Sequence, residues 1–351
     1  MLRLKRATVL SAACGADAME QRLAIEIDGE RRAAVADLGL VGPSQVGDEL
    51  IVNVEALDLR LGSGGFDVVH VNLTRGLDGE GTPGAHVMKL NYTSLQHAIA
   101  PVEEGDPDLA APPAVQLPLH RPVAVLALHG QLAPLAWAFG QARDGARLGY
   151  VQTPGGALPG GHSCVVRDLR GRGLLAGHLT AGGAFGGADG DSVTTAAALH
   201  HGLSALGWDA AVAGPGPGLL GSGSTLGHGG MQALDSAHAA LALGCPALLA
   251  ARMSSTDARP RHRGLSHHTR TVLGLLLAPL SVALPEGHEL SSDRHECVVR
   301  RADLEGYDSS GLPTRSMGRE DPLFFAAALA AGTALAEMAE AASEAWSDRS
   351  A

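Results

Sequence analysis

The segment RPRHRGLSHHT, residues 259–269, concentrates side chains that can bind anions and transfer protons. Arg261 and Arg263 carry planar guanidinium groups, which form paired hydrogen bonds with phosphate or carboxylate oxygens. The chain as a whole has a formal net charge of −11, so this cluster indicates a local site for an anion rather than a generally basic surface.

Two adjacent histidines, His267 and His268, follow Ser266 in the same segment. Ser266 is a suitable N-cap, so we expect a helix to begin here with both histidines in its first turn. A helix N-terminus lowers the pKa of a histidine, and a neutral imidazole suits a general base or a metal ligand. Because adjacent helical residues project about 100° apart, we expect at most one histidine to face a site. The alternative is a capped turn with two exposed histidines.

A glycine-rich segment, GPGPGLLGSGSTLGHGG at residues 214–230, is the second candidate. Glycines allow the backbone to turn its amides toward a ligand, and hydroxyl side chains add further donors. A helix expected to begin near Gly230 adds positive potential, which together predicts an anion-binding loop. The alternative is a mobile loop that only covers the sheet edge. The candidate binding residues of this loop are Gly216, Gly218, Gly221, Ser222, Gly223, Ser224 and Thr225.

Residues 216–221, GPGLLG, formally match the dinucleotide pattern GxGxxG. That fingerprint requires a helix directly after the loop and an acidic residue at the end of the next strand. In this chain the helix is expected only near Gly230, and the next strand ends in Arg252. We therefore do not expect a nicotinamide or flavin dinucleotide. No Gly-Lys-Ser/Thr sequence is present, which excludes a P-loop.

A divalent metal stays open as a cofactor. His129, at the end of a predicted strand, could meet His228, His267 or Asp191. We expect Asp191 to cap a helix and to orient either a histidine or a metal. The chain contains no HxH or HExxH motif, however, so the spacing alone does not identify a metal site.

Two more charged residues are candidates for substrate contact. Arg319, in SMGRED ahead of the last predicted helix, would neutralise negative charge on a ligand. Lys89, in HVMKLNYT at residues 86–93, would supply a charge at a domain interface. The alternative for Lys89 is a solvated lysine on an edge strand. Ser222 or Ser224 would be a nucleophile only if a histidine reached it, because no GxSxG motif is present.

The order of predicted elements indicates how these residues could meet. Residues 1–100 contain short strand-like runs separated by Gly, Asp and Pro, which predict a small β-barrel or sandwich. Residues 101–122 are rich in proline and acidic residues and predict a linker. Residues 123–345 alternate apolar strands with helices, as in a doubly wound, mostly parallel α/β sheet. Six polar or glycine-rich loops follow the predicted strands, so we expect a site at the carboxyl ends of the sheet.

Composition excludes several classes of partner. Aromatic residues make up 3% of an acidic chain, so we expect no nucleic-acid partner. The four cysteines are dispersed, which favours a reducing cytoplasm over a disulfide scaffold. The apolar C-terminal run PLFFAAALAAGTALA is soon followed by Glu337, so we expect no membrane span. A homo-oligomer stays open.

The polar loops together resemble a bacterial family of domains of unknown function, DUF3866. The resemblance covers almost the whole chain and implies that the two-part layout is one unit, and that the protein is bacterial and cytoplasmic. It implies no reaction. The segments that carry it are HVMKLNYTSLQ (86–96), LHGQL (128–132), TPGGALP (153–159), TAGGAFGG (180–187), GPGPGLLGSGSTLGHGG (214–230), RHRGLSHHT (261–269) and SMGRED (316–321).

The residues themselves favour an enzyme, a transferase or hydrolase, that acts on a small phosphorylated or carboxylated substrate. In this hypothesis the glycine loop and the arginines bind the anion, and His267 or His268 transfers a proton. The alternative is a ligand-binding or regulatory protein that uses the same pocket without chemistry.

Overall fold

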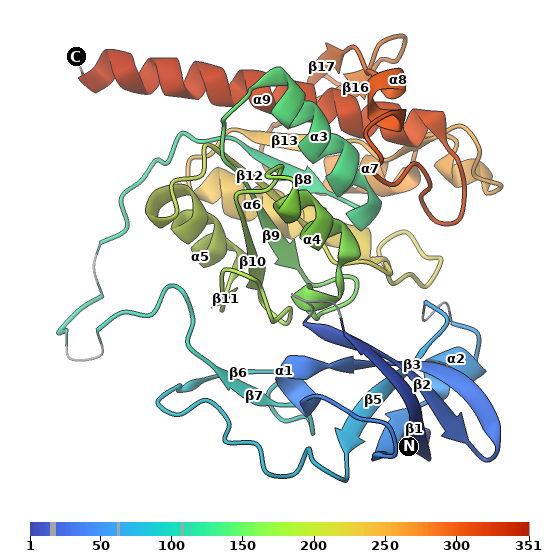
Figure 1. Ribbon diagram of the computed structural model, residues 1–351. Coiled ribbons are helices and arrows are strands. Elements are labelled where there is room, and N and C mark those ends of the chain that lie inside the picture. The colour runs from blue at the N-terminus through green and yellow to red at the C-terminus, as the bar shows by residue number, and fades with distance from the viewer. Residues whose placement is uncertain (15–18, 62–63, 107–108, 113, 351) are drawn as a thin grey trace. The chain divides into compact units, whose positions relative to one another are not determined.

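The computed structural model describes residues 1–14, 19–61, 64–106, 109–112 and 114–350 (Figure 1). The chain forms two compact units, Met1–Ala100 and Pro101–Ala351. The first unit has one hydrophobic core, and the second has a core on each face of its sheet.

The first unit is a closed barrel, as its short strands predicted. Its strands are, in order around the barrel, β1 (Leu4–Cys14), β2 (Glu20–Ile27), β3 (Glu30–Asp37), β5 (Asp67–Asn72) and β4 (Glu49–Asn53). Val9, Ile25 and Leu50 are buried inside it, because alternate residues of each strand point inward. The unit also contains α1 (Leu38–Val41), α2 (Glu55–Asp58), β6 (Val87–Lys89) and β7 (His97–Ile99).

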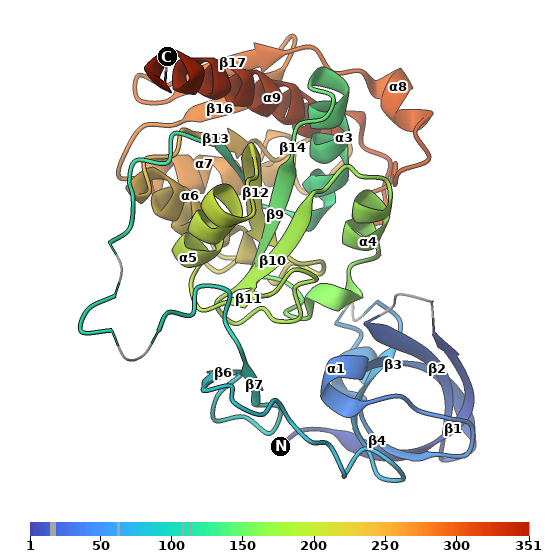
Figure 2. The same cartoon turned by 60° about the vertical axis from the view of Figure 1, so that its left-hand side comes forward.

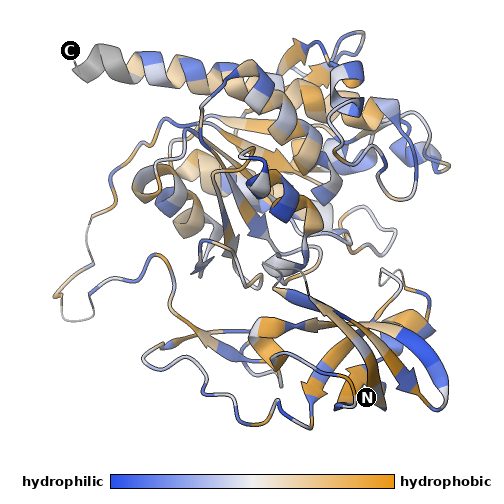
Figure 3. Ribbon diagram, in the orientation of Figure 1, coloured by the Kyte–Doolittle hydropathy of each residue, from blue (hydrophilic) through white to orange (hydrophobic). Residues whose placement is uncertain are grey.

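Eight parallel strands form the sheet of the second unit. Their spatial order is β11 (Asp191–Ser192), β10 (Gly177–Ala181), β9 (Leu148–Thr153), β12 (Ala210–Pro215), β8 (Val123–Leu126), β13 (Ala247–Ala250), β16 (Ser281–Pro285) and β17 (Glu296–Arg300). The central strands β8 and β13 are continuous apolar runs, because both faces of the sheet are covered (Figure 3).

Helices cover both faces of this sheet, which confirms the doubly wound α/β fold (Figure 2). Ala124 and Leu126 of β8 face one core, whereas Val123 and Val125 face the other. The first face carries α3 (Leu132–Ala142), α4 (Cys164–Gly171), α8 (Leu304–Asp308) and α9 (Pro322–Ser350). The second face carries α5 (Thr195–His200), α6 (Gln232–Ala242) and α7 (His267–Leu275).

The connections change face at β8, which lies between β12 and β13. The chain leaves β8 for α3 on one face, but it leaves β12 and β13 for α6 and α7 on the other. Loops that leave neighbouring strands in opposite directions open a crevice at the carboxyl ends, where ligands of α/β sheets bind. The topology therefore selects the ends of these three strands as the place for a site.

The C-terminal helix α9 is long and apolar enough to cross a membrane by length and composition alone. The expectation that Glu337 rules this out is therefore wrong. The apolar window of the helix is nevertheless 72% buried inside the protein, and Phe324 and Leu335 belong to the core beneath it. A helix covered in this way is typical of the core of a soluble α/β protein.

Trp208 is completely buried, and three glycines provide the space that its indole ring occupies. Gly149 of β9 lies directly against the ring: an added Cβ would lie 1.9 Å from Cδ2 and Cε3 of Trp208. Gly177 and Gly202 approach the same ring, with closest distances of 2.8 and 2.3 Å from an added Cβ. The absence of side chains at these positions is a packing requirement of β9 and its neighbours.

A Gly149→Ala substitution is expected to lower the free energy of unfolding by about 3 kcal/mol, because the new methyl group overlaps the indole ring. Gly171→Ala is the matched control. Gly171 is the last residue of α4, and no neighbouring atom lies within 4 Å of a Cβ added there. We expect the control to be neutral or to stabilise by up to about 1 kcal/mol. Urea unfolding of both variants measures the difference, and equal stabilities would contradict the packing argument.

Candidate functional site

A cavity of about 800 Å3 lies at the carboxyl ends of β8, β12 and β13, a suitable volume for a small molecule. Four of the six loops expected at this edge contribute to its wall, and His228 and Arg252 are members of two of these loops. The two other loops, 153–159 and 180–187, follow β9 and β10 and lie outside the wall. The contributing loops lie within residues 128–130, 217–224, 259–268 and 315–317.

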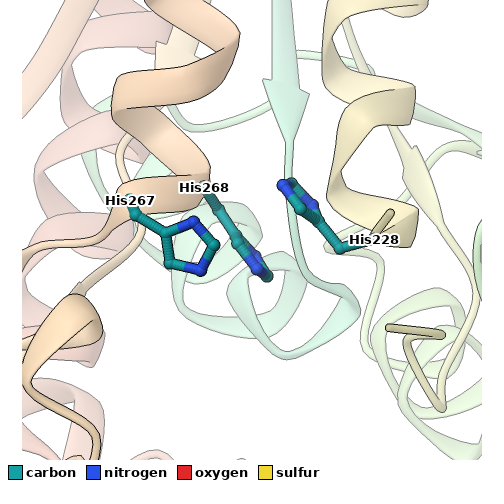
Figure 4. A group of neighbouring side chains, drawn as sticks. All are labelled: His228, His267 and His268. Carbon is teal, nitrogen blue, oxygen red and sulfur yellow. The ribbon is translucent and has the colours of Figure 1, made fainter. Parts of the chain in front are cut away.

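Three histidines gather in this wall (Figure 4). His228 comes from the glycine-rich loop, and His267 and His268 begin α7. The rings of His228 and His268 are stacked, with centroids 3.5 Å apart and planes at 7°. The ring of His267 stands across both of them, at 82° and 75°, with centroids 5.7 and 4.4 Å away. Two segments distant in the sequence thus form one cluster of imidazoles.

Ser266 is the N-cap of α7, as predicted. Its hydroxyl accepts a hydrogen bond from the backbone amide of His268 at 3.2 Å, and it lies 2.8 Å from Nδ1 of the buried His262. Both His267 and His268 line the cavity, so the expectation that at most one would face a site is wrong. The cavity borders the first turn of α7, and both histidines of that turn reach it.

Arg252 follows β13 and donates a hydrogen bond from Nη1 to Nδ1 of His268 at 2.7 Å. A guanidinium group can only donate, so Nδ1 is the acceptor and Nε2 carries the proton of the neutral ring. His268 therefore presents an N–H donor at its second nitrogen. Arg252 is 3% exposed and lines the cavity, but sequence reasoning used it only as evidence against a dinucleotide site.

The imidazoles of the cluster and of the neighbouring His262 are neutral near pH 7. Burial, followed by the positive charge of Arg252, lowers the pKa of His268 to about 2. Burial, followed by the charges of Arg252 and Arg259, lowers the pKa of His262 to about 4. The pKa values of His228 and His267 are also lowered, in both cases mainly by burial. Positive charge in this wall therefore comes from arginine and not from histidine.

The three clustered histidines each offer one nitrogen, and these atoms lie within 4.8 Å of one another. A metal ligand directs its lone pair along the ring plane, so the parallel rings of His228 and His268 cannot both point at one ion as they lie. A metal-bound histidine also donates its other N–H to an acceptor, whereas Nδ1 of His268 faces a donor. Binding a cation would require these side chains to turn and the bond to Arg252 to break.

The predicted arginines have different positions. Arg261 lines the cavity, as expected. Arg263 is exposed and donates from Nε to the carbonyl oxygen of Asp257 at 3.0 Å, and Arg319 pairs with the carboxylate of the same residue at 3.0 Å. Arg263 and Arg319 lie outside the residues that form the wall, which instead includes Arg252, Arg259 and Arg315. The spacing of the arginines in the sequence did not show which of them line the cavity and which lie outside it.

The glycine-rich loop lines the cavity with Gly218, Gly221, Ser222, Gly223 and Ser224, but not with Gly216 or Thr225. Gly218 and Gly223 have φ values of 73° and 80°, a conformation that glycine adopts without strain. Gly216 serves packing, because an added Cβ would lie 2.3 Å from the carbonyl oxygen of Ala157. The hydroxyls of Ser222 and Ser224 bond to each other at 3.0 Å, and neither makes a hydrogen bond with a described histidine.

His129 lines the cavity from the end of β8, but both of its nitrogens are engaged. Nδ1 lies 3.2 Å from the carbonyl oxygen of Pro215, so it carries the proton, and Nε2 accepts from the hydroxyl of Ser163 at 2.8 Å. Ser163 also caps α4 by accepting from the amide of Val166 at 3.1 Å. The hydrogen bonds to Pro215 and Ser163 fix the orientation of the His129 ring. Burial lowers the pKa of His129 to about 4.

Asp191 does not reach the histidine cluster. It lies in β11, the edge strand, and accepts hydrogen bonds from the hydroxyl of Thr180 and from the amide of Gly187. The predicted N-cap role is wrong as well, because Thr194 caps α5. Lys89 is buried in β6 of the first unit, and its contribution to the site stays a prediction.

A family model described as a protein of unknown function (DUF3866) matches residues 33–332, and the chain belongs to this family. The matched span includes most of both units. No curated protein and no solved structure shows a significant match to the chain.

The pH dependence of protein stability tests whether a buried imidazole stays neutral. His178 allows this test at a residue outside the cavity wall. His178 of β10 stacks on Tyr150 with ring centroids 5.4 Å apart, and burial lowers its pKa from 6.5 to about 3. Below pH 6.5 the unfolded chain therefore binds a proton that the folded chain does not. The stability contribution of neutral His178 is complete above this pH and decreases as the pH falls toward 3.

We expect a His178→Gln variant to lose about 2 kcal/mol less stability between pH 7 and pH 5 than the unmodified protein. Urea unfolding at the two pH values measures both losses. A variant that loses as much as the unmodified protein would show that His178 titrates normally in the folded state.

Proposed function

We propose that this DUF3866 member is a cytoplasmic bacterial enzyme, a transferase or hydrolase, whose cavity binds a small phosphorylated or carboxylated substrate. One observation carries the proposal: among the described residues that line the cavity, every charged side chain is an arginine. A wall whose charged side chains are all cationic, around a volume of about 800 Å3, suits a small anion and disfavours a cationic ligand.

The glycine-rich loop supports the same proposal. Gly218, Gly221 and Gly223 place backbone in the wall without side chains, so amide groups can approach a ligand closely. Ser222 and Ser224 add hydroxyl groups that can donate to ligand oxygens. Leu219, Leu220 and Met317 line the same cavity and would contact an uncharged part of the substrate.

His267 is the residue that we assign to proton transfer. It lies in the wall, is only half-buried, and its ring makes no hydrogen bond to a described residue, so a nitrogen is free for a reacting group. Burial lowers its pKa, and the charge of Arg261 lowers it further, so the imidazole is neutral near pH 7 and can accept a proton. In hydrolysis, His267 would accept a proton from the attacking water while the water oxygen bonds to the substrate and the leaving oxygen departs.

A His267→Ala variant is expected to lose turnover by a factor of about 100 or more, because a positioned base contributes about that much to the rate. Hydrolysis of p-nitrophenyl phosphate and of mono-p-nitrophenyl succinate, an ester with a free carboxylate, provides the two readouts, one for each substrate class. Calorimetry with inorganic phosphate is expected to show affinity within a few-fold of the unmodified protein.

His288→Ala is the matched control, because His288 lies outside the cavity wall. It is expected to retain both turnover and phosphate binding. Phosphate binding without turnover of either ester in the unmodified protein would support a non-catalytic ligand-binding protein instead of the enzyme proposed here.

A further inference from the structure

The arginines around the cavity have too few carboxylate partners. Arg259 contacts both carboxylate oxygens of Asp257, at 3.0 and 2.9 Å. Arg319 and Arg252 approach Oδ2 of that same carboxylate, at 3.0 and 3.8 Å. Asp257 thus carries one negative charge for three guanidinium groups.

Two further arginines, Arg315 and Arg261, line the cavity, and only one of them has a carboxylate partner in the described part of the chain. Arg315 pairs with Glu320 at 3.1 Å, and both side chains are well exposed. Arg261 lines the cavity and has no carboxylate within ion-pair distance among the described residues. The cluster therefore retains an excess of positive charge of more than one unit.

Arg252 is the most deeply buried arginine of the cluster, and its charge is only weakly compensated. Its side chain is 3% exposed. Among the described residues it has one ion pair, to Asp257, which is long at 3.8 Å and shared with two other arginines. A buried charge is stable only when it is paired and hydrogen-bonded. Arg252 also borders the cavity, so an anion bound there would supply the missing charge.

The hydrogen-bonding capacity of the wall points in the same direction. Its described polar side chains are arginines, histidines and serines, without a carboxylate or carboxamide. Nδ1 of His268 is occupied by Arg252, so its remaining nitrogen donates. His228 is 7% exposed, and neither of its nitrogens makes a hydrogen bond of normal geometry, although the backbone of Thr225 approaches the ring. Such a wall favours a ligand that accepts several hydrogen bonds.

We propose that this cavity binds the phosphoryl group of a phosphate monoester as its dianion, in contact with Arg252, Arg261 and the Nε2–H of His268. A phosphoryl group carries up to about two negative charges at neutral pH and three acceptor oxygens, whereas a carboxylate carries one charge on two oxygens. Only the dianion matches the charge excess around Arg252. The inference rests on the proposed anion site and selects the phosphorylated class among its substrates.

Calorimetry on the full chain, with inorganic phosphate and with acetate at pH 8 and low salt, tests this inference. Phosphate is expected to bind at least tenfold more tightly than acetate. Equal affinities would overturn the phosphoryl assignment and leave the anion site of the proposed function intact, whereas binding of neither anion would overturn both. Dialysis against EDTA is expected to leave phosphate binding unchanged. Loss of binding after EDTA would mean that a metal holds the anion, and direct contact would be wrong.

Substitutions locate the contact. Arg252→Gln and Arg261→Gln are each expected to weaken phosphate binding at least tenfold, and Arg294→Gln is the control for the loss of one exposed positive charge. Arg261 is exposed and lacks a described ion pair, so its variant keeps the test decisive if Arg252→Gln does not fold. Phosphate affinities of the cavity variants within twofold of the control would overturn the proposal.

Discussion

The cationic wall of the cavity depends on one buried carboxylate, Asp257. Its side chain is 1% exposed, and the hydrogen bonds from Arg259 hold its pKa well below the usual range, so it stays ionised. It accepts from the side chains of Arg259 and Arg319, and its backbone carbonyl accepts from Arg263. Asp257 thus fixes the loop that bears Arg261 while neutralising only part of the charge around it. The same contacts give the loop its shape and leave the wall positive.

The cavity also requires that the ends of β8 and β13 hold a fixed position relative to each other, because their loops leave the sheet toward opposite faces. Gln131, completely buried at the start of α3, bridges the ends of β8 and β13. Its Oε1 accepts from the amide of Leu128 at 3.1 Å, and its Nε2 donates to the carbonyl oxygens of Ala250 and Ala251 at 3.0 and 3.2 Å. Arg252 follows these carbonyl groups directly, so its position relative to the loop after β8 is set by hydrogen bonds of a neighbouring side chain.

Local sequence signals predicted the architecture well because they depend on short-range physics. The apolar runs of β8 and β13 and the cap at Ser266 each act within a few residues of the chain. The site was harder to predict, since the role of Arg252 arises from its contact with His268 across the fold. The prediction for Asp191 was wrong for a related reason. The segment DSVTT contains four residues of types that cap helices, and the pairing of Asp191 with β10 leaves Thr194 as the cap.

The two edges of the second sheet also limit how copies of the chain could associate. At one edge, β11 has only two residues, too few to template an added strand. At the other, β17 begins with Glu296 and ends with Arg300, which forms an ion pair with Glu337 of α9. Short or charged edges disfavour strand addition, and the closed barrel of the first unit offers no edge at all. The barrel and the eight-stranded sheet therefore disfavour self-association through a sheet that continues from one chain into the next.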